Sequence, residues 1–221
     1  MPNITAAIQI IEEKGYHVGY MVYDLSTGKE LTYNADEVIY GASTIKAPYV
    51  ASFARENPQA VAEDYEAIYK TLVNSSNDDY TMLWEKYGTD CLMRFFEDAG
   101  LEPELGKQKW LALSARQLCM LWQQVYRDFS AGRIDEKVGE CMEVRGSAPI
   151  GKLLGTKYLT RTKLGGIAGS NDFYQAANDA GIVYAGDHPY IMVIMTTASA
   201  KFELLEPLIS ALDEAHQELV G

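Results

Sequence analysis

Ser43 and Lys46 are three positions apart at the start of a predicted helix, which residues 47–53 continue. This spacing puts both side chains on one helix face, one turn apart. A serine hydroxyl is a weak nucleophile until a neighbour takes its proton, and a lysine amine can do so when burial or another cation lowers its pKa. The N–H groups of a helix N-terminus also stabilise an oxyanion. The pair predicts a nucleophile and its base, although a capping serine beside a surface lysine explains the same spacing.

Two further polar segments could complete such a site. Ser75 and Asn77 follow one apolar helix end and precede another helix, where hydroxyl and amide groups can relay a proton and hold a substrate amide. Lys163 lies in a later predicted strand, just before Gly165 and Gly166, where a cation is presented and a ligand can approach the backbone. Each segment also has a purely structural explanation: a helix cap for the first, a strand end with a solvated lysine for the second.

The segments are far apart in the chain, so predicted elements must bring them together. Helical spacing indicates helices over 3–14 and 202–219, and strand patterns cover 17–25, 30–34, 158–166, 180–184 and 190–197. The intervening residues are almost wholly helical. We therefore expect an α+β fold with an antiparallel five-stranded sheet flanked by the N- and C-terminal helices. An α/β lobe (1–40 and 156–221) would carry an inserted all-helical lobe (41–155).

Cap residues and an apolar stripe refine the helical middle. Thr89 is expected to cap a helix that ends before Gly100, and Ser114 to cap another that ends near Gly132. The apolar positions of this last helix form one stripe, which predicts core packing. They are Leu118, Leu121, Trp122 and Val125.

Bulk composition narrows the classes of function. The chain has 221 residues and a formal net charge of −12, with ordinary apolar content, which predicts a folded domain. Phosphate contacts require clustered Lys and Arg, so the charge argues against nucleic-acid binding. No apolar run reaches the roughly 20 residues of a membrane-spanning helix. The cysteines Cys91, Cys119 and Cys141 lack metal-ligand spacing and are expected to be buried thiols, so we expect no metal or other cofactor.

In chain order, the three segments resemble the motifs of the serine β-lactamase and penicillin-binding protein superfamily, especially its class A branch. That superfamily carries Ser-x-x-Lys, then Ser-x-Asn, then Lys-Thr/Ser-Gly. The surrounding elements match as well, since the first motif follows a hairpin and starts a helix, and the second opens a helix that runs to Gly88. The matching residues are Ser43, Lys46, Ser75, Asn77, Lys163 and Gly165.

The resemblance implies a role for each residue. Ser43 would attack a carbonyl and become acylated, while Lys46 takes its proton. Ser75 would relay a proton to the leaving nitrogen, and Asn77 would position Lys46 and the substrate amide. Lys163 would draw in a substrate carboxylate. No cofactor is implied, and the ligand would be a small β-lactam or a peptidoglycan-like peptide.

The resemblance also implies an oxyanion site and a spatial arrangement. Backbone N–H groups of Ser43 and of the strand after Gly165, near Ile167, would hold the oxyanion, with Gly166 also lining the substrate site. We expect the Ser43 hydroxyl within hydrogen-bonding reach of both motif lysines, with residues 75–77 closing the same cleft. No histidine lies near this nucleophile in the predicted elements, so we do not expect a Ser-His-Asp triad.

Two features depart from the superfamily pattern. Leu164 stands where Thr or Ser is usual, which removes a hydroxyl that helps bind the ligand carboxylate. Glu102 and Glu104 lie in a segment that looks like the loop with the deacylation base of class A enzymes, but the loop from 100 to 114 is much shorter. An acidic helix-to-helix connection is the alternative interpretation of those two glutamates.

Three functions stay open at this level. The first is a β-lactamase-like serine hydrolase acting through an acyl-enzyme on β-lactams or related amides and esters. The second is a D-alanyl-D-alanine peptidase or a slow penicillin-binding protein. The third, from another class, is a catalytically idle domain that binds a ligand. We expect an exported protein, of the cell envelope or secreted, whose signal is missing from this sequence, with a cytoplasmic location as the alternative.

Overall fold

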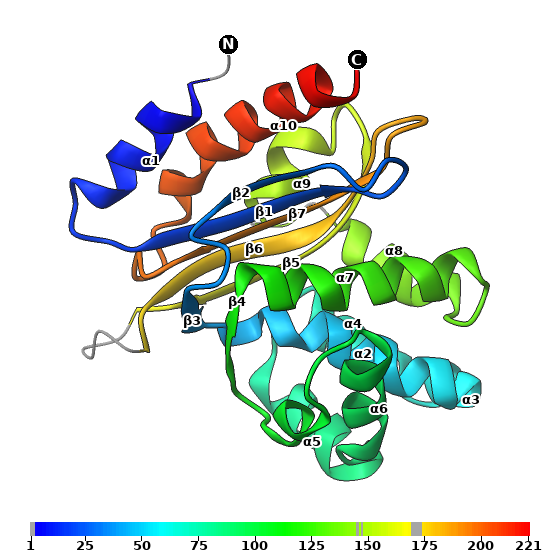
Figure 1. The fold of residues 1–221 in the computed structure, drawn as a ribbon. Helices are drawn as coiled ribbons and strands as arrows, with labels where there is room; N and C mark the ends of the chain where they lie inside the picture. Colours follow the sequence, from blue (N-terminus) through cyan, green and yellow to red (C-terminus); the bar gives the residue numbers. More distant parts are fainter. Residues whose placement is uncertain (1–2, 145, 147, 169–173) are drawn as a thin grey trace.

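In this computed structural model, which describes residues 3–144, 146, 148–168 and 174–221, five antiparallel strands form one sheet (Figure 1). Their spatial order is β2-β1-β7-β6-β5. The N-terminal hairpin joins the C-terminal strands through the β1–β7 pairing, which confirms the predicted sheet and α+β class. The strands are β1 (Val18–Asp24), β2 (Glu30–Tyr33), β5 (Leu159–Ile167), β6 (Ala176–Tyr184) and β7 (Tyr190–Thr196).

Strand β6 begins at Ala176, earlier than the predicted start at residue 180. The extra residues include Asn178 and Asp179, whose polar side chains do not fit a buried strand pattern. Both are fully buried and hydrogen-bonded: Asn178 Nδ2 donates to Tyr40 O at 2.9 Å, and Asp179 Oδ2 accepts from Ile150 N at 2.8 Å. Partners from distant segments make the buried polar groups tolerable, and the sequence pattern contains no sign of them.

Helices cover both faces of the sheet. On one face, α1 (Ile4–Glu12), α9 (Pro149–Leu154) and α10 (Glu206–Val220) bury a cluster of aliphatic side chains against it (Figure 1). On the other face packs α7 (Ala115–Ser130), whose predicted apolar stripe is fully buried. The two apolar layers fix the sheet between them, because apolar surface on each face is removed from water.

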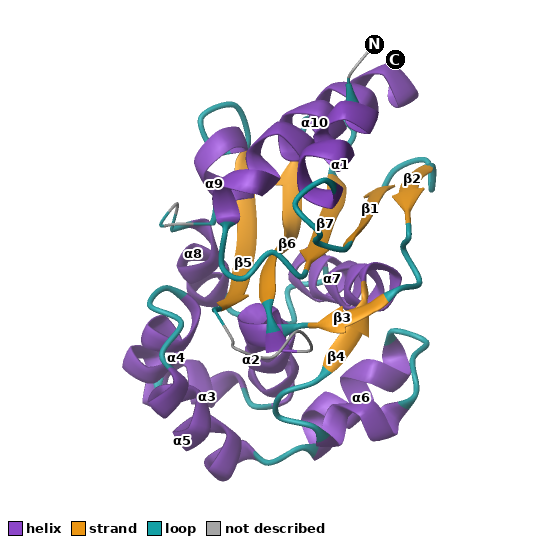
Figure 2. Ribbon diagram, turned by 90° about the vertical axis from the view of Figure 1, so that its left-hand side faces the viewer, coloured by secondary structure: helices purple, strands orange, loops and turns teal. Residues whose placement is uncertain are grey.

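The remaining helices lie below the sheet in the view of Figure 2, with α8 next to β5. Leading into these helices, the short 3₁₀ helix η1 (Ala42–Ile45) runs directly into α2. The loop between α6 and α7 contains a second 3₁₀ turn, η2 (Pro103–Lys107). The remaining helices are α2 (Lys46–Glu56), α3 (Pro58–Glu63), α4 (Tyr65–Leu72), α5 (Asn77–Tyr87), α6 (Asp90–Asp98) and α8 (Glu136–Glu143).

A small second sheet was not predicted. Strand β3 (Val38–Tyr40) pairs with β4 (Ala112–Ser114), so residues 41–155 are not wholly helical. The pairing joins the chain just before η1 to the segment just before α7. It therefore crosses the predicted lobe boundary at residue 40, and that division into lobes stays a prediction.

Of the two predicted caps, one forms. Ser114 caps α7 in a capping box, in which its hydroxyl accepts from Gln117 N and the Gln117 side chain accepts from Ser114 N. Thr89 precedes α6 but makes no side-chain cap hydrogen bond. The helix nevertheless ends before Gly100, which adopts a positive φ of 77°.

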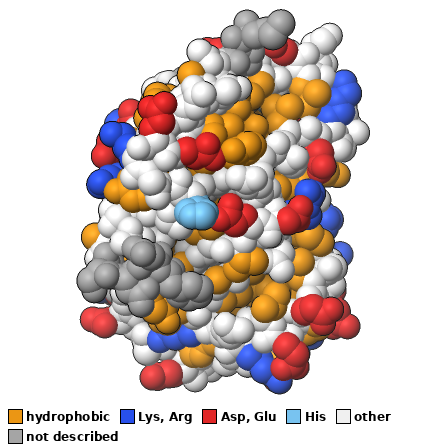
Figure 3. All heavy atoms as spheres, turned by 60° about the vertical axis from the view of Figure 1, so that its left-hand side comes forward, with side chains coloured by type: hydrophobic (Ala, Val, Ile, Leu, Met, Phe, Trp, Pro, Cys, Tyr) orange, Lys and Arg blue, Asp and Glu red, His pale blue; other side chains and the backbone are white. Residues whose placement is uncertain are grey.

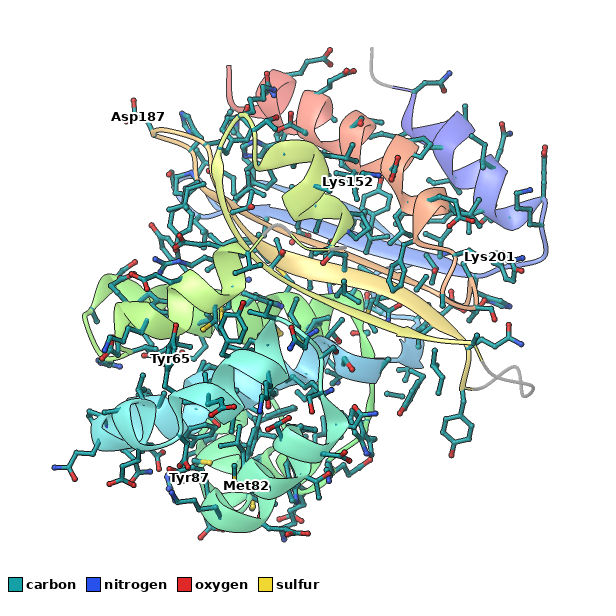
Figure 4. The ribbon with its side chains drawn as sticks, turned by 180° about the vertical axis from the view of Figure 1, so that it is seen from behind. Tyr65, Met82, Tyr87, Lys152, Asp187 and Lys201 are labelled. Atoms are coloured by element: carbon teal, nitrogen blue, oxygen red, sulfur yellow. The ribbon has the colours of Figure 1, made fainter. Side chains whose placement is uncertain are left out.

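The far end of the sheet lies away from the predicted site. Asp187 marks the tip of the β6–β7 turn in Figure 4, beside the end of β5 that starts at Leu159. Lys152 belongs to the helical layer on the other side of the sheet from Tyr87 and Met82.

The three cysteines are buried free thiols, as expected. Within the described ranges, no helix combines the length and apolarity needed to cross a membrane.

Candidate active site

Ser43 lies in the tight turn that connects β3 to α2. Thr44 stabilises this turn, since its hydroxyl donates to Gly41 O at 2.7 Å. Ala42 adopts a φ of +48°, a left-handed conformation that costs a non-glycine residue about 1–2 kcal/mol. Ala42 directly precedes Ser43, and local backbone strain of this kind is common at functional sites. The turn therefore presents Ser43 at a helix start, as the sequence predicts.

Ser43 is half-buried and lines a cavity of about 360 Å³. One wall comes from α5 and from Trp110 after the η2 loop, and another comes from the end of β5. Asn77, Gly166 and Ile167, all predicted site residues, share the cavity. Its lining residues are Tyr40, Ala42, Ser43, Asn77, Thr81, Trp110, Gly166 and Ile167.

Lys46 extends from the first turn of α2 into residues 75–77. It is fully buried, and its Nζ donates to Ser75 O at 2.6 Å, Ser76 O at 3.2 Å and Asn77 Oδ1 at 2.7 Å. Burial lowers the pKa of Lys46 to about 7, with help from the charges of Lys163 and Lys109. An amine with such a pKa is partly neutral near pH 7 and can accept a proton.

Lys163 reaches the same segment from the sheet. It is buried, and its Nζ donates to Ser75 Oγ at 3.0 Å and to Leu164 O at 3.0 Å. Burial lowers the pKa of Lys163 to about 8, an effect opposed by the charge of Asp179. Ser75 has a φ of +56°, so this residue too is held in a left-handed conformation. The predicted motifs at 46, 75–77 and 163 therefore meet in space.

One detail of the expected geometry is wrong. Among the described residues, no hydrogen bond joins the Ser43 hydroxyl to Lys46 or Lys163. Two backbone carbonyls and an amide oxygen surround the Lys46 ammonium, and they satisfy its three donors. A protonated Lys46 is thus held by residues 75–77.

Gly165 brings strand β5 against the turn that carries Ser43. A Cβ atom at this position would lie 2.7 Å from Gly41 O, 2.7 Å from Thr44 N and 2.8 Å from Ser43 N. Contacts this short are excluded for a real side chain, so only glycine allows the strand and the turn to approach so closely. Gly166 is similarly confined by the ring of Phe202.

The two glutamates that resembled a deacylation base lie elsewhere. Glu102 precedes η2 and is exposed, and Glu104 is exposed and pairs with Lys107 at 2.8 Å. Neither lines the Ser43 cavity. Leu164 lines a separate small cavity, together with Ser75 and Lys163. The structure therefore places the predicted motif residues together but leaves Glu102 and Glu104 outside the cavity.

Four residues near the cavity were missed by the sequence analysis: Tyr40, Thr81, Lys109 and Trp110. Only Thr81 had a detectable signal, because it lies four residues after Asn77 on the same helix, where i and i+4 side chains share a face. Its hydroxyl donates to Asn77 O at 2.7 Å. Tyr40 and Trp110 enter the cavity from separate segments of the chain, which spacing cannot predict.

A larger cavity of about 460 Å³ lies beyond Tyr40, which is the one described residue that lines both cavities. In it, His17 Nδ1 and Glu37 Oε1 are hydrogen-bonded at 2.6 Å, and Ser43 is not among its lining residues. Figure 3 views this side of the molecule, where a histidine lies beside acidic side chains with apolar side chains above and below. Since Ser43 and Asn77 line the smaller cavity and not this one, the smaller cavity is the candidate active site.

Other catalytic arrangements find no support in the described chain. His216 Nε2 lies 2.8 Å from Asp24 Oδ2, but no described serine hydroxyl is hydrogen-bonded to a described histidine. That buried pair secures α10 on the sheet. In the same described ranges, no group of three or more His, Cys, Asp or Glu side chains could hold a metal ion.

Comparisons with known proteins identify the family and the fold. The model of the β-lactamase enzyme family matches residues 3–61 and 64–215. No curated protein matches the chain by sequence. Solved structures with the same fold include a β-lactamase from Chitinophaga pinensis, with a TM-score of 0.75 and 15% identity over 96% of this chain and 98% of that one. An ancestral class A β-lactamase gives 0.76 and 17% over 96% and 98%.

A penicillin-binding protein shares the fold as well. The structure of PBP-A has a TM-score of 0.73 and 18% identity, covering 97% of this chain and 96% of that one. Identities this low establish the fold alone, whereas the family match spans nearly the whole chain. The chain therefore belongs to the β-lactamase enzyme family, within the superfamily of serine β-lactamases and penicillin-binding proteins.

Proposed function

We propose that the chain is a serine hydrolase that is acylated on Ser43 by β-lactams or related amides and esters. The observation that carries this proposal is the meeting of Lys46 and Lys163, each with a lowered pKa, on residues 75–77 beside the Ser43 cavity. A point mutant of PBP-A is described as an acyl-enzyme complex with penicillin G, and L2 as complexed with relebactam. Both share this fold, which supports a β-lactam as the ligand.

In the proposed reaction, Ser43 Oγ attacks the carbonyl carbon while its proton passes to neutral Lys46. The negative charge that develops on the carbonyl oxygen is held by backbone N–H groups of Ser43 and of the strand near Ile167. The carbon–nitrogen bond then breaks, and the Ser75 hydroxyl gives its proton to the leaving nitrogen and is reprotonated with the proton that Lys46 took from Ser43. Lys163 holds Ser75 and binds the substrate carboxylate, and Asn77 keeps Lys46 in place.

The acyl-enzyme should be long-lived. Among the described residues, no carboxylate lines the Ser43 cavity, so the water needed for deacylation lacks a carboxylate base there. This observation favours a penicillin-binding acylase or peptidase over an efficient β-lactamase.

Mass spectrometry after incubation with benzylpenicillin tests the proposal. We expect one added benzylpenicillin on the tryptic peptide 30–46, in which Ser43 is the one serine. The adduct should persist after the free drug is removed, and Glu102→Gln should leave its lifetime unchanged because that side chain lies off the cavity. Rapid clearance would identify a β-lactamase instead, and the lack of any adduct with β-lactams and activated esters would support an idle binding domain.

The acylation rate should depend on pH in a specific way. Because Lys46 must be neutral, the rate rises with pH, about tenfold per unit, until pH passes its pKa of about 7. Because Lys163 must be charged to bind a carboxylate, the rate falls again above about pH 8. The two apparent pKa values belong to the coupled pair of lysines. Stopped-flow acylation between about pH 5 and pH 10 checks this profile.

An activated ester without a carboxylate is the control for that profile. It should keep the acid limb, which reports Lys46, and lose the alkaline limb, which reports Lys163. A flat profile with benzylpenicillin across the neutral range would contradict the roles of both lysines.

A further inference from the structure

Lys109 is a third lysine at the candidate site that no motif predicts. It precedes Trp110, which lines the Ser43 cavity, and its Nζ donates to the hydroxyl of Thr81, which lines the cavity as well. The Lys109 Nζ lies 5.7 Å from the ring centroid of Tyr80, the same ring that Lys46 Nζ approaches to 5.4 Å. The half-buried Lys109 ammonium therefore lies at the edge of the cavity, on the wall formed by α5 and Trp110.

The hydrogen-bonding capacity of this ammonium is largely unused. An ammonium has three donors, and the Thr81 hydroxyl is the one acceptor that contacts Lys109 among the described residues. In the same set of residues, no carboxylate lies within 4.0 Å of Lys109, Lys46 or Lys163. Two residues earlier, Lys107 pairs with Glu104 at 2.8 Å. A cation without a counter-ion, in a chain of net charge −12, is well placed to bind an anionic ligand.

The two available cations belong to different elements around the cavity. Lys163 belongs to β5, which contributes Gly166 and Ile167 to the cavity, whereas Lys109 lies with Trp110 and Thr81. Ser43 lies in the η1 turn and lines the same cavity. A substrate that places its carbonyl at Ser43 can therefore meet one positive charge from β5 and another from the segment of Lys109 and Trp110.

We propose that Lys109 binds a second anionic group of the substrate, on its acyl part, while Lys163 binds the carboxylate on the amine side. The substrate class is then a dianionic amide or β-lactam with one carboxylate on each side of the scissile carbonyl. This inference rests on the proposed function, since it extends the same acylation site.

Lys109 also has an indirect effect that the test must separate. Its charge helps to lower the pKa of Lys46, so removing it raises that pKa and slows acylation by every substrate at neutral pH. This effect is common to any two substrates. It cancels in the ratio of their acylation rates, so that the ratio reports direct binding by Lys109.

Carbenicillin and benzylpenicillin are the probes, because they differ by one carboxylate on the acyl side chain. The measurement is the second-order rate constant for acylation of Ser43 by each drug. In Lys109→Met, the carbenicillin-to-benzylpenicillin ratio should fall about tenfold, as expected for losing a charge-assisted hydrogen bond. Lys109→Gln keeps a donor for Thr81 but has no charge, so the ratio should fall equally in this variant. It also provides a test if the methionine variant does not fold.

Lys107→Met is the matched control, since it removes the same charge from the same loop at an exposed position outside the cavity. The carbenicillin-to-benzylpenicillin ratio of acylation rate constants in Lys107→Met should equal that of the parent protein. If both Lys109 variants keep the parental ratio while acylation still occurs, the second anion subsite is overturned and the proposed function stands. If neither drug acylates the parent protein, the proposed function fails, and the subsite with it.

Discussion

Lys46→Met is expected to slow the acylation of Ser43 by benzylpenicillin about a thousandfold, because general base catalysis typically contributes between about 10² and 10⁴. The variant removes the amine beside Ser43 whose pKa is lowered to about 7. Methionine has a similar length and is apolar, so the side chain can still occupy the buried channel. The measurement is the rate at which the adduct forms, followed by the mass of the intact protein and compared with the parent.

A structural role for Lys46 must be separated from its role as a base. Its ammonium satisfies Ser75 O, Ser76 O and Asn77 Oδ1, and each buried acceptor left without a donor costs about 1–3 kcal/mol. Lys46→Arg keeps a charge and several donors but cannot lose its proton at neutral pH. We expect this variant to be as slow as Lys46→Met. Normal acylation in Lys46→Arg would show that the cation positions residues 75–77 and does not take the proton.

Gly165→Ala is expected to lower the acylation rate by at least about a hundredfold, and to lower the melting temperature as well. The added Cβ would lie within 2.8 Å of three backbone atoms in the turn of Ser43, and backbone on both sides cannot move as a flexible side chain can. Relieving the contact must separate β5 from η1, and a shift of about 1 Å can cost 10²-fold in rate. Overpacking of this kind destabilises by about 1–3 kcal/mol.

Gly146→Ala is the matched control for that variant. A Cβ there would lie 3.7 Å from Val144 O, an ordinary contact, and the position is outside the cavity. We expect parental acylation from Gly146→Ala, measured together with its thermal unfolding. If Gly165→Ala acylates as fast as this control, the close approach of β5 to η1 is not needed for catalysis.

These two variants probe different parts of the same site. The lowered pKa of Lys46 depends on the burial of its side chain. Gly165, in contrast, sets the distance between strand β5 and the turn that carries Ser43. The two positions do not share a hydrogen bond in the described chain. Loss of acylation in both would therefore support the proposed geometry from two independent directions.

The local features of this protein follow from its sequence. The three-residue spacing of Ser43 and Lys46, the capping box at Ser114 and the buried stripe of α7 all depend on residues one helical turn apart. The strand patterns likewise predict four of the five strands of the sheet closely, with β6 as the exception. Interactions over such short separations are fixed by backbone geometry, so composition and spacing are enough to predict them.

The tertiary structure alone decided how the site is assembled. Lys163 Nζ meets Ser75 Oγ across a separation of 88 residues, and Lys109 and Trp110 lie at the cavity while Glu102 and Glu104 face solvent. The lowered pKa of Lys46 arises from burial by segments distant in the chain. Desolvation and long-range contacts depend on how elements pack, and a pattern along one chain does not contain that distance information.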